Sequence, residues 1–112
     1  MRLEYTELEG GIRLIKLIGR LDLNGTYSVE VQFVRHCSGN NIRVIVDLSD
    51  VSFLSSVGIP MLVNTAKAVV NRGGEFAILR PSENVAKVLE LIGVPQVIPI
   101  HEDLDLAVAS MS

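Results

Sequence analysis

One short stretch, residues 42–48, is dominated by apolar and β-branched side chains and has polar residues on both sides. A run of this length is too short for a typical helix and is typical of a strand that is covered on both faces. Such strands occupy the interior of parallel or mixed sheets, because helices must cover both of their faces. The stretch therefore predicts an α/β fold in which residues 42–48 form the central strand.

The hydrophobic period changes after this strand. At a helical pitch the following apolar residues share one arc: Ile59, Leu62, Val63, Ala66, Val69 and Val70. The predicted strand thus gives way to an amphipathic helix at Ser55 and Ser56. A serine at a helix start accepts hydrogen bonds from unpaired backbone N–H groups, and the helix dipole favours a negative charge there. This turn is therefore a predicted helix cap and a candidate site for a phosphate.

Turn and cap residues divide the rest of the chain into further elements. Strands at 3–8 and 12–18 are expected to form a hairpin across Glu9-Gly10-Gly11. The remaining expected elements are a helix that Asn24-Gly25-Thr26 opens and that runs to about Ser38, a strand at 75–79, a helix from Pro81-Ser82 to Gly93, a short edge strand at 97–100, and a last helix opened by Glu102 and Asp103. The expected fold is a small mixed central sheet of four to five strands, with about four helices packed mainly on one face.

Length, charge and cysteine content restrict the function. The 112 residues are expected to form a single domain, residues 1–112, that is long enough to bury its apolar surface without a metal or disulfide, and Cys37 alone can form no internal disulfide. The N-terminus is too polar for a signal peptide, so the protein is expected to be cytoplasmic and not inserted in a membrane. A net charge of −3 with scattered Lys and Arg argues against nucleic-acid binding. No nucleotide-binding loop is present either, so no cofactor is expected.

The segment around the two serines resembles a known family, the STAS-domain anti-sigma-factor antagonists of bacteria. Its motif is Asp, apolar, Ser, any, Val, any, Phe or Tyr, apolar, Asp, Ser, Ser or Thr, Gly. The positions that match it in order are Asp47, Leu48, Ser49, Val51, Phe53, Leu54, Ser56 and Gly58. Two positions depart from it: Ser55 stands where the best-known members have Asp, and Val57 stands where they have Ser or Thr. The resemblance extends to Gly19-Arg20-Leu21-Asp22, Arg72-Gly73-Gly74 and residues 88–93.

The resemblance implies a protein switch and no enzymatic activity. Ser56 would be the phosphorylation site, with Ser55 as a competing acceptor. The unphosphorylated domain would bind an anti-sigma factor that is itself a serine kinase, and so regulate transcription by a sigma factor. Phosphorylation would end the interaction, and a phosphoserine phosphatase would restore it.

A partner-binding surface is expected next to the acceptor serine. Val57, Met61, Asn64 and Ala68 form an i, i+4, i+7, i+11 line on the helix face opposite the predicted core arc. The remaining predicted partner-binding residues are Asp22, Ser55, Ser56 and Gly58. Plainer interpretations stay open, because isolated surface apolar residues are normal, Ser56 could only cap the helix, and Asp22 could be a turn or cap residue.

Two other functions compete with the switch. STAS domains also serve as non-switching subunits of lipid-transport assemblies and as parts of sensory complexes. A small hydrolase would use Ser55 or Ser56 as nucleophile with His36 or His101 as base and Asp47 as the orienting acid. The serine segment lacks the Gly-x-Ser-x-Gly pattern of a nucleophile elbow, which counts against the hydrolase.

Overall fold

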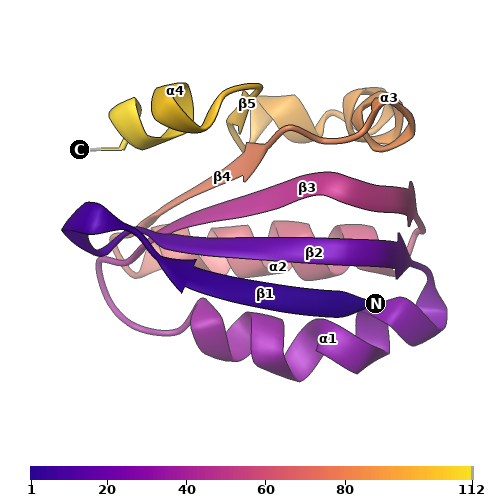
Figure 1. Ribbon diagram of the computed structural model, residues 1–112, viewed down its shortest axis with the longest axis horizontal. Coiled ribbons are helices and arrows are strands. Elements are labelled where there is room, and N and C mark those ends of the chain that lie inside the picture. The colour runs from indigo at the N-terminus through magenta and orange to yellow at the C-terminus, as the bar shows by residue number, and fades with distance from the viewer. Residues whose placement is uncertain (112) are drawn as a thin grey trace.

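The computed structural model describes residues 1–111; Ser112, which the single-domain prediction includes, lies outside the described residues. Its five strands lie in the order β1-β2-β3-β4-β5 within one sheet (Figure 1). The strands are β1 (Arg2–Glu7), β2 (Arg13–Leu21), β3 (Arg43–Leu54), β4 (Glu75–Leu79) and β5 (Ile100–His101). The first two pair antiparallel, and the other neighbours pair parallel. The predicted hairpin and the central position of residues 42–48 are confirmed.

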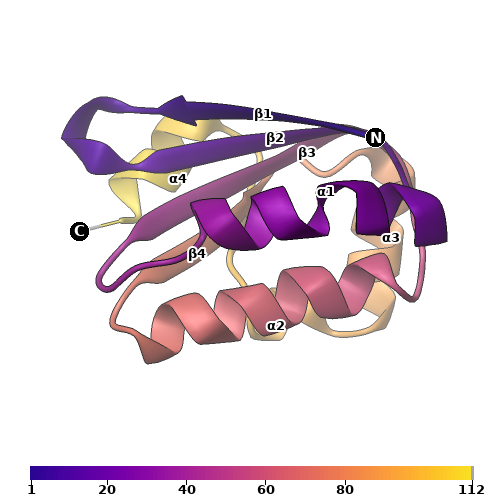
Figure 2. The ribbon, with the colours of Figure 1, turned by 90° about the horizontal axis from the view of Figure 1, so that it is seen from below.

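Four α-helices connect or follow these strands, and two short 3-10 turns, η1 (Glu9–Gly11) and η2 (Val94–Gln96), complete the chain. The helices are α1 (Leu23–His36), α2 (Gly58–Asn71), α3 (Glu83–Leu91) and α4 (Leu104–Ala109). Figure 2 shows α1 and α2 side by side beneath the sheet, with α4 on its other side. Buried side chains of α1, α2 and α3 share the larger core, and α4 covers a smaller one. The predicted mixed sheet with about four helices, mainly on one face, is therefore confirmed.

The central strand extends further than its apolar run predicted. β3 pairs with β4 only over residues 43–47, whereas its pairing with β2 continues to Leu54. Past Asp47 one edge of β3 has no strand beside it within the described residues. Polar residues such as Ser49 and Asp50 are exposed there, so this half of the strand needs no apolar run.

Two helix starts differ from the expected ones. α1 begins at Leu23, because the Asp22 carboxylate caps it, and not at Asn24-Gly25-Thr26. α2 begins at Gly58, so Ser55 and Ser56 lie in the turn before it and not in its first turn. Pro60 then occupies the third helical position, where a missing N–H costs no helical hydrogen bond.

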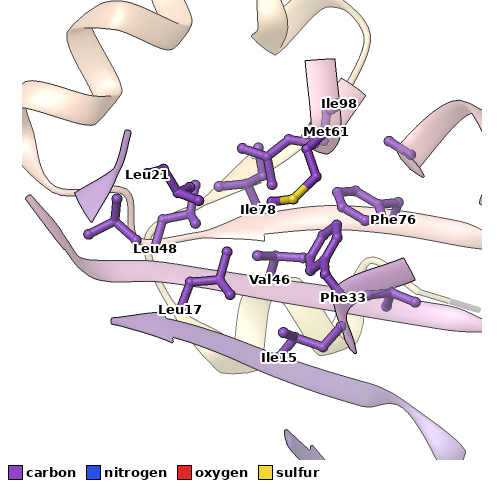
Figure 3. Packing of buried hydrophobic residues seen from close by; sticks show 14 of the residues in the cluster. Ile15, Leu17, Leu21, Phe33, Val46, Leu48, Met61, Phe76, Ile78 and Ile98 are labelled. Atoms are coloured by element: carbon purple, nitrogen blue, oxygen red, sulfur yellow. The ribbon is translucent and has the colours of Figure 1, made fainter. Parts of the chain in front are cut away.

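The buried face of α2 is rotated from the predicted arc toward α1. Leu62, Ala66 and Val69 are buried as expected, but Val70 is 57 % exposed and Met61 is buried. Figure 3 shows Met61 among the core side chains, close to Ile78 and Phe76. The prediction that Met61 lies on the face opposite the core was wrong, because α1 packs beside α2 and covers that side of the helix.

Candidate functional site

The turn between β3 and α2 lies where the parallel strands β2 and β3 end. The Ser55 N–H donates to the Leu21 carbonyl oxygen across 2.9 Å, which ties this turn to the last residue of β2. In open α/β sheets, binding sites gather at this carboxyl edge, since the loops that leave the strands are free to vary. The two serines are therefore held at the edge of the sheet that favours a functional site.

The Ser55 hydroxyl is a structural cap. It donates to the Leu21 carbonyl oxygen at 2.6 Å and accepts from the N–H groups of Val57 and Gly58, at 3.3 Å each. A carboxylate could accept from the same two N–H groups. Serine at this position, where the family motif has Asp, therefore preserves the helix cap.

The Ser56 hydroxyl is free. Its residue is exposed, and the hydroxyl makes no hydrogen bond to any residue between 1 and 111. An exposed hydroxyl without a protein partner can enter the active site of another protein without breaking a bond in its own. The adjacent serine lacks this property, since its hydroxyl would have to leave Leu21.

Most of the backbone N–H groups at the start of α2, where a phosphate was expected to bind, already have hydrogen-bond acceptors. The Gly58 N–H and the Ile59 N–H donate to the Ser55 carbonyl oxygen at 3.1 and 3.3 Å, in addition to the bonds to the Ser55 hydroxyl. A phosphate on Ser56 would meet the field of the helix dipole but would compete with Ser55 for the N–H groups.

A groove runs between α1 and α2 and includes Ser56 in its lining. The groove has a volume of about 650 Å³. Its α2 side brings together five of the predicted partner-binding residues: Ser56, Val57, Met61, Asn64 and Ala68. Met61 is only 5 % exposed, so it closes the floor of the groove and presents little surface to a partner.

The opposite wall of this groove comes from α1, which sequence reasoning missed. Glu30 and Val34 line it, and the only other charged residue in the lining is Arg72. Tyr27 and Val31, on the same helix, are 63 % and 68 % exposed. Their helical spacing with Val34 was visible in the sequence, but the spacing did not show that this stripe faces solvent while the stripe of Val29, Phe33 and Cys37 faces the core.

Besides Ser55, two more predicted partner-binding residues have structural roles outside the groove lining. The Asp22 carboxylate accepts from the Gly25 N–H at 2.8 Å and lies 3.5 Å from the Arg20 guanidinium. The hydrogen bond from Gly25 chiefly, with Arg20 in support, holds the pKa of Asp22 below its ordinary value. Gly58 is buried, and a Cβ there would lie 3.0 Å from Leu54 Cδ1 and 3.1 Å from Leu21 Cβ.

The arrangement around the serines does not match a hydrolase. The His36 ring stacks on Tyr5 with 4.1 Å between centroids, and His101 belongs to β5 at the edge of the sheet. The hydroxyl of Ser55 donates to a backbone carbonyl and not to a histidine. The Asp47 carboxylate accepts from the Ser49 N–H at 2.9 Å.

Cys37 also lines the groove. Burial raises the pKa of the Cys37 thiol to about 12. Within residues 1–111 no three His, Cys, Asp or Glu side chains are grouped closely enough to hold a metal ion. None of the helices described is both long and apolar enough to cross a membrane.

The mixed five-stranded sheet and the serine turn after its central strand place this protein among the small α/β proteins. The STAS domain model matches residues 5–107, and the chain belongs to this family. A Thermotoga maritima protein, provisionally named an anti-sigma factor antagonist, is 31 % identical over 65 residues. That match covers 58 % of this chain and 58 % of the relative, so the chain spans little more than half the length of that relative.

Solved structures of the same family share the fold. The anti-sigma-factor antagonist (STAS) domain protein of Planctomyces limnophilus has a TM-score of 0.82 at 22 % identity, over 96 % of both chains. The unphosphorylated form of the anti-sigma factor antagonist SpoIIAA has a TM-score of 0.76 at 18 % identity, over 97 % of this chain and 95 % of that one. The phosphorylated form of Bacillus SpoIIAA has a TM-score of 0.69 at 17 % identity, over 97 % of this chain and 98 % of that one. At these sequence identities, the structural similarity establishes that this chain shares their fold.

Proposed function

We propose that this protein is an anti-sigma-factor antagonist controlled by phosphorylation of Ser56. Unphosphorylated, it binds an anti-sigma factor that is also a serine kinase, and thereby releases the sigma factor that the kinase holds. The kinase phosphorylates Ser56 and ends the interaction, and a phosphatase restores it. The protein acts in the cytoplasm and catalyses no reaction itself.

The observation that carries this proposal is the free, exposed hydroxyl of Ser56 in the lining of the α1–α2 groove. A kinase needs an acceptor hydroxyl that it can reach, and Ser56 meets this requirement where Ser55 does not. The family's names for its members and the existence of SpoIIAA in phosphorylated and unphosphorylated forms support the same assignment.

The groove explains how a phosphate would end binding. Among its lining residues only Glu30 and Arg72 carry a charge. A phosphoserine adds about 1.5 to 2 negative charges at pH 7, which must be desolvated when a partner covers this surface. Because the first N–H groups of α2 are already used by Ser55, the protein itself offers the phosphate little compensation.

Substitutions at Ser56 test the proposal. Ser56→Ala should retain binding and escape phosphorylation, whereas Ser56→Glu should bind at least tenfold more weakly, a difference of about 1.4 kcal/mol. The measurement is affinity capture from native lysate with wild-type, Ser56→Ala and Ser56→Glu baits, followed by titration of the captured kinase and phosphosite mapping of the wild type.

Ser110→Glu is the matched control, because Ser110 is an exposed serine that follows α4 and does not line the groove. It adds the same charge and should leave binding unchanged. Equal binding by the wild type and Ser56→Glu would reject the switch. Absence of phosphorylation together with co-purification of transporter subunits would point to a non-switching STAS subunit.

A further inference from the structure

Strand β1 leaves one edge of the sheet open. It is the first strand in the sheet order, and five of its six residues are exposed, Leu3 being half-buried. Its pairing with β2 runs without a register shift from Arg2 to Glu7, and the strand contains no proline. Natural edge strands are commonly protected by prolines, bulges or inward-pointing charges. This edge has none of these features, but it carries the charged side chains of Arg2, Glu4 and Glu7, so a strand that pairs with its free backbone groups must match those charges.

The hairpin shows which backbone groups face outward. The Leu8 N–H donates to the Ile12 carbonyl oxygen at 2.7 Å, and the same register continues along both strands. In an antiparallel pair, residues alternate between bonding the partner strand and pointing away from it. Even-numbered residues of β1 therefore bond to β2, while the N–H and C=O groups of Leu3 and Tyr5 point to the open edge.

Charges alternate across the sheet beside this edge. Glu4 lies opposite Lys16 of β2, and Lys16 lies opposite Asp47 of β3 in register. Lys16 Nζ also forms an ion pair with Asp50 Oδ2 at 3.0 Å. From β1 inward, the charges of Glu4, Lys16 and Asp47 are therefore negative, positive and negative. A strand added outside β1 would continue the alternation if it placed a positive charge opposite Glu4.

We propose that β1 pairs antiparallel with β1 of a second copy of this chain, about a two-fold axis at Leu3. This register places Arg2 opposite the partner's Glu4, and Glu4 opposite the partner's Arg2. Within one chain Arg2 Nη2 lies 3.2 Å from Glu4 Oε2, and both side chains stay accessible, with 69 % and 52 % of their surfaces exposed, so each can also face the opposite charge of the partner. Opposite charges at facing positions stabilise an antiparallel pair, and like charges destabilise it.

Neighbouring registers lack this complementarity. An axis at Glu4 would set two glutamates against each other, and an axis at Tyr5 would give no pair of opposite charges. The pairing uses only a few residues from each copy, so we expect a weak, concentration-dependent dimer. It involves no residue of the α1–α2 groove, and it therefore stands or falls independently of the function proposed for Ser56.

Sedimentation equilibrium of the full chain, at protein concentrations from about 10 µM to 1 mM in low salt, tests the dimer. We expect the wild-type dissociation constant to fall within this range. Arg2→Glu and Glu4→Arg should each raise it about tenfold, because each sets like charges opposite one another twice. The double variant Arg2→Glu, Glu4→Arg should restore the wild-type value to within about threefold.

Glu7→Arg is the matched control, since it makes the same charge change on β1 outside the paired stretch. It should leave the dissociation constant unchanged. A wild type that stays monomeric throughout the range, a double variant that does not recover, or a control as weakened as Glu4→Arg would overturn the proposal. Raising the NaCl concentration should weaken the wild-type dimer, because salt screens the charge pairs. This measurement does not depend on the folding of any variant. An unchanged dissociation constant would contradict the proposal.

Discussion

At the scale of single residues, the adjacent side chains of Ser55 and Ser56 make different contacts because of the turn in which they lie. The Ser55 side chain points back to Leu21 and to the first N–H groups of α2, and it uses its donor and acceptor capacity there. One residue later, Ser56 is exposed and its hydroxyl makes no hydrogen bond to any residue between 1 and 111. Ser55 therefore caps the helix, and the phosphate acceptance that we propose falls to Ser56, so that the two roles need not compete for one serine.

This division predicts unequal effects on stability. Ser55→Ala should lower the free energy of unfolding by about 1 kcal/mol, the usual cost of losing a serine cap. Ser56→Ala should change it by less than about 0.5 kcal/mol, since no hydrogen bond is lost. Urea denaturation followed by circular dichroism measures both values. Equal losses would show that Ser56 shares the capping role.

At the scale of elements, α1 and α2 both begin close to the end of β2. The close approach of both helices to β2 depends on glycines: Gly25 in the first turn of α1 and Gly58 at the start of α2. A Cβ at Gly25 would overlap the Arg20 carbonyl oxygen. A Cβ at Gly58 would lie 3.0 Å from Leu54 Cδ1, 3.1 Å from Leu21 Cβ and 3.2 Å from the Leu21 carbonyl oxygen. These glycines set how closely the helices approach the sheet beside the serine turn.

Gly25→Ala should therefore destabilise the protein more than Gly58→Ala. A backbone oxygen cannot move away from the new methyl group without shifting α1, so we expect a loss above about 3 kcal/mol. At Gly58 the nearest atoms would lie 3.0–3.2 Å away, so small shifts can relieve the contacts and a loss of about 1–2 kcal/mol is expected. Chemical denaturation measures both, with the neighbouring exposed Asn24→Ala as the control. The reverse order would contradict the packing described.

At the scale of the whole molecule, the sheet separates two cores of unequal size. The larger one lies under α1, α2 and α3, and Phe33 at its centre is fully buried with its ring edge-on to Phe76, 6.4 Å between centroids. The smaller one lies under α4, where Ile45, Ala77 and Leu79 meet Ala107 and Met111. Most of the stabilisation by apolar burial therefore comes from the helix layer that also forms the groove.

This asymmetry predicts that Phe33→Ala costs about 3–5 kcal/mol, as for other buried phenylalanines. Val108→Ala, on the half-buried face of α4, should cost about 1 kcal/mol or less. The two free energies of unfolding are obtained from urea titrations of the purified variants. Similar losses at the two positions would mean that α4 contributes far more than its six residues indicate.

The sequence alone determined the order and type of most elements, but the edge strand expected at 97–100 is found only at Ile100–His101, after the 3-10 turn Val94–Gln96. The β-branched run predicted the central strand, Gly10-Gly11 predicted the hairpin, and residues 75–79 form a strand with the predicted bounds. It also located the serine turn, and the STAS resemblance there agrees with the family model. These features follow from local composition and period, which need no knowledge of a neighbouring element.

Only the tertiary structure decided which faces are covered and which hydroxyl is free. Met61 is buried because α1 packs beside α2, and the groove exists only where the two helices meet. Asp22 caps α1, and Ser55 caps α2, through atoms whose positions depend on the end of β2. Periodicity reports the faces of one helix, whereas burial and hydrogen bonding depend on what other elements bring against it.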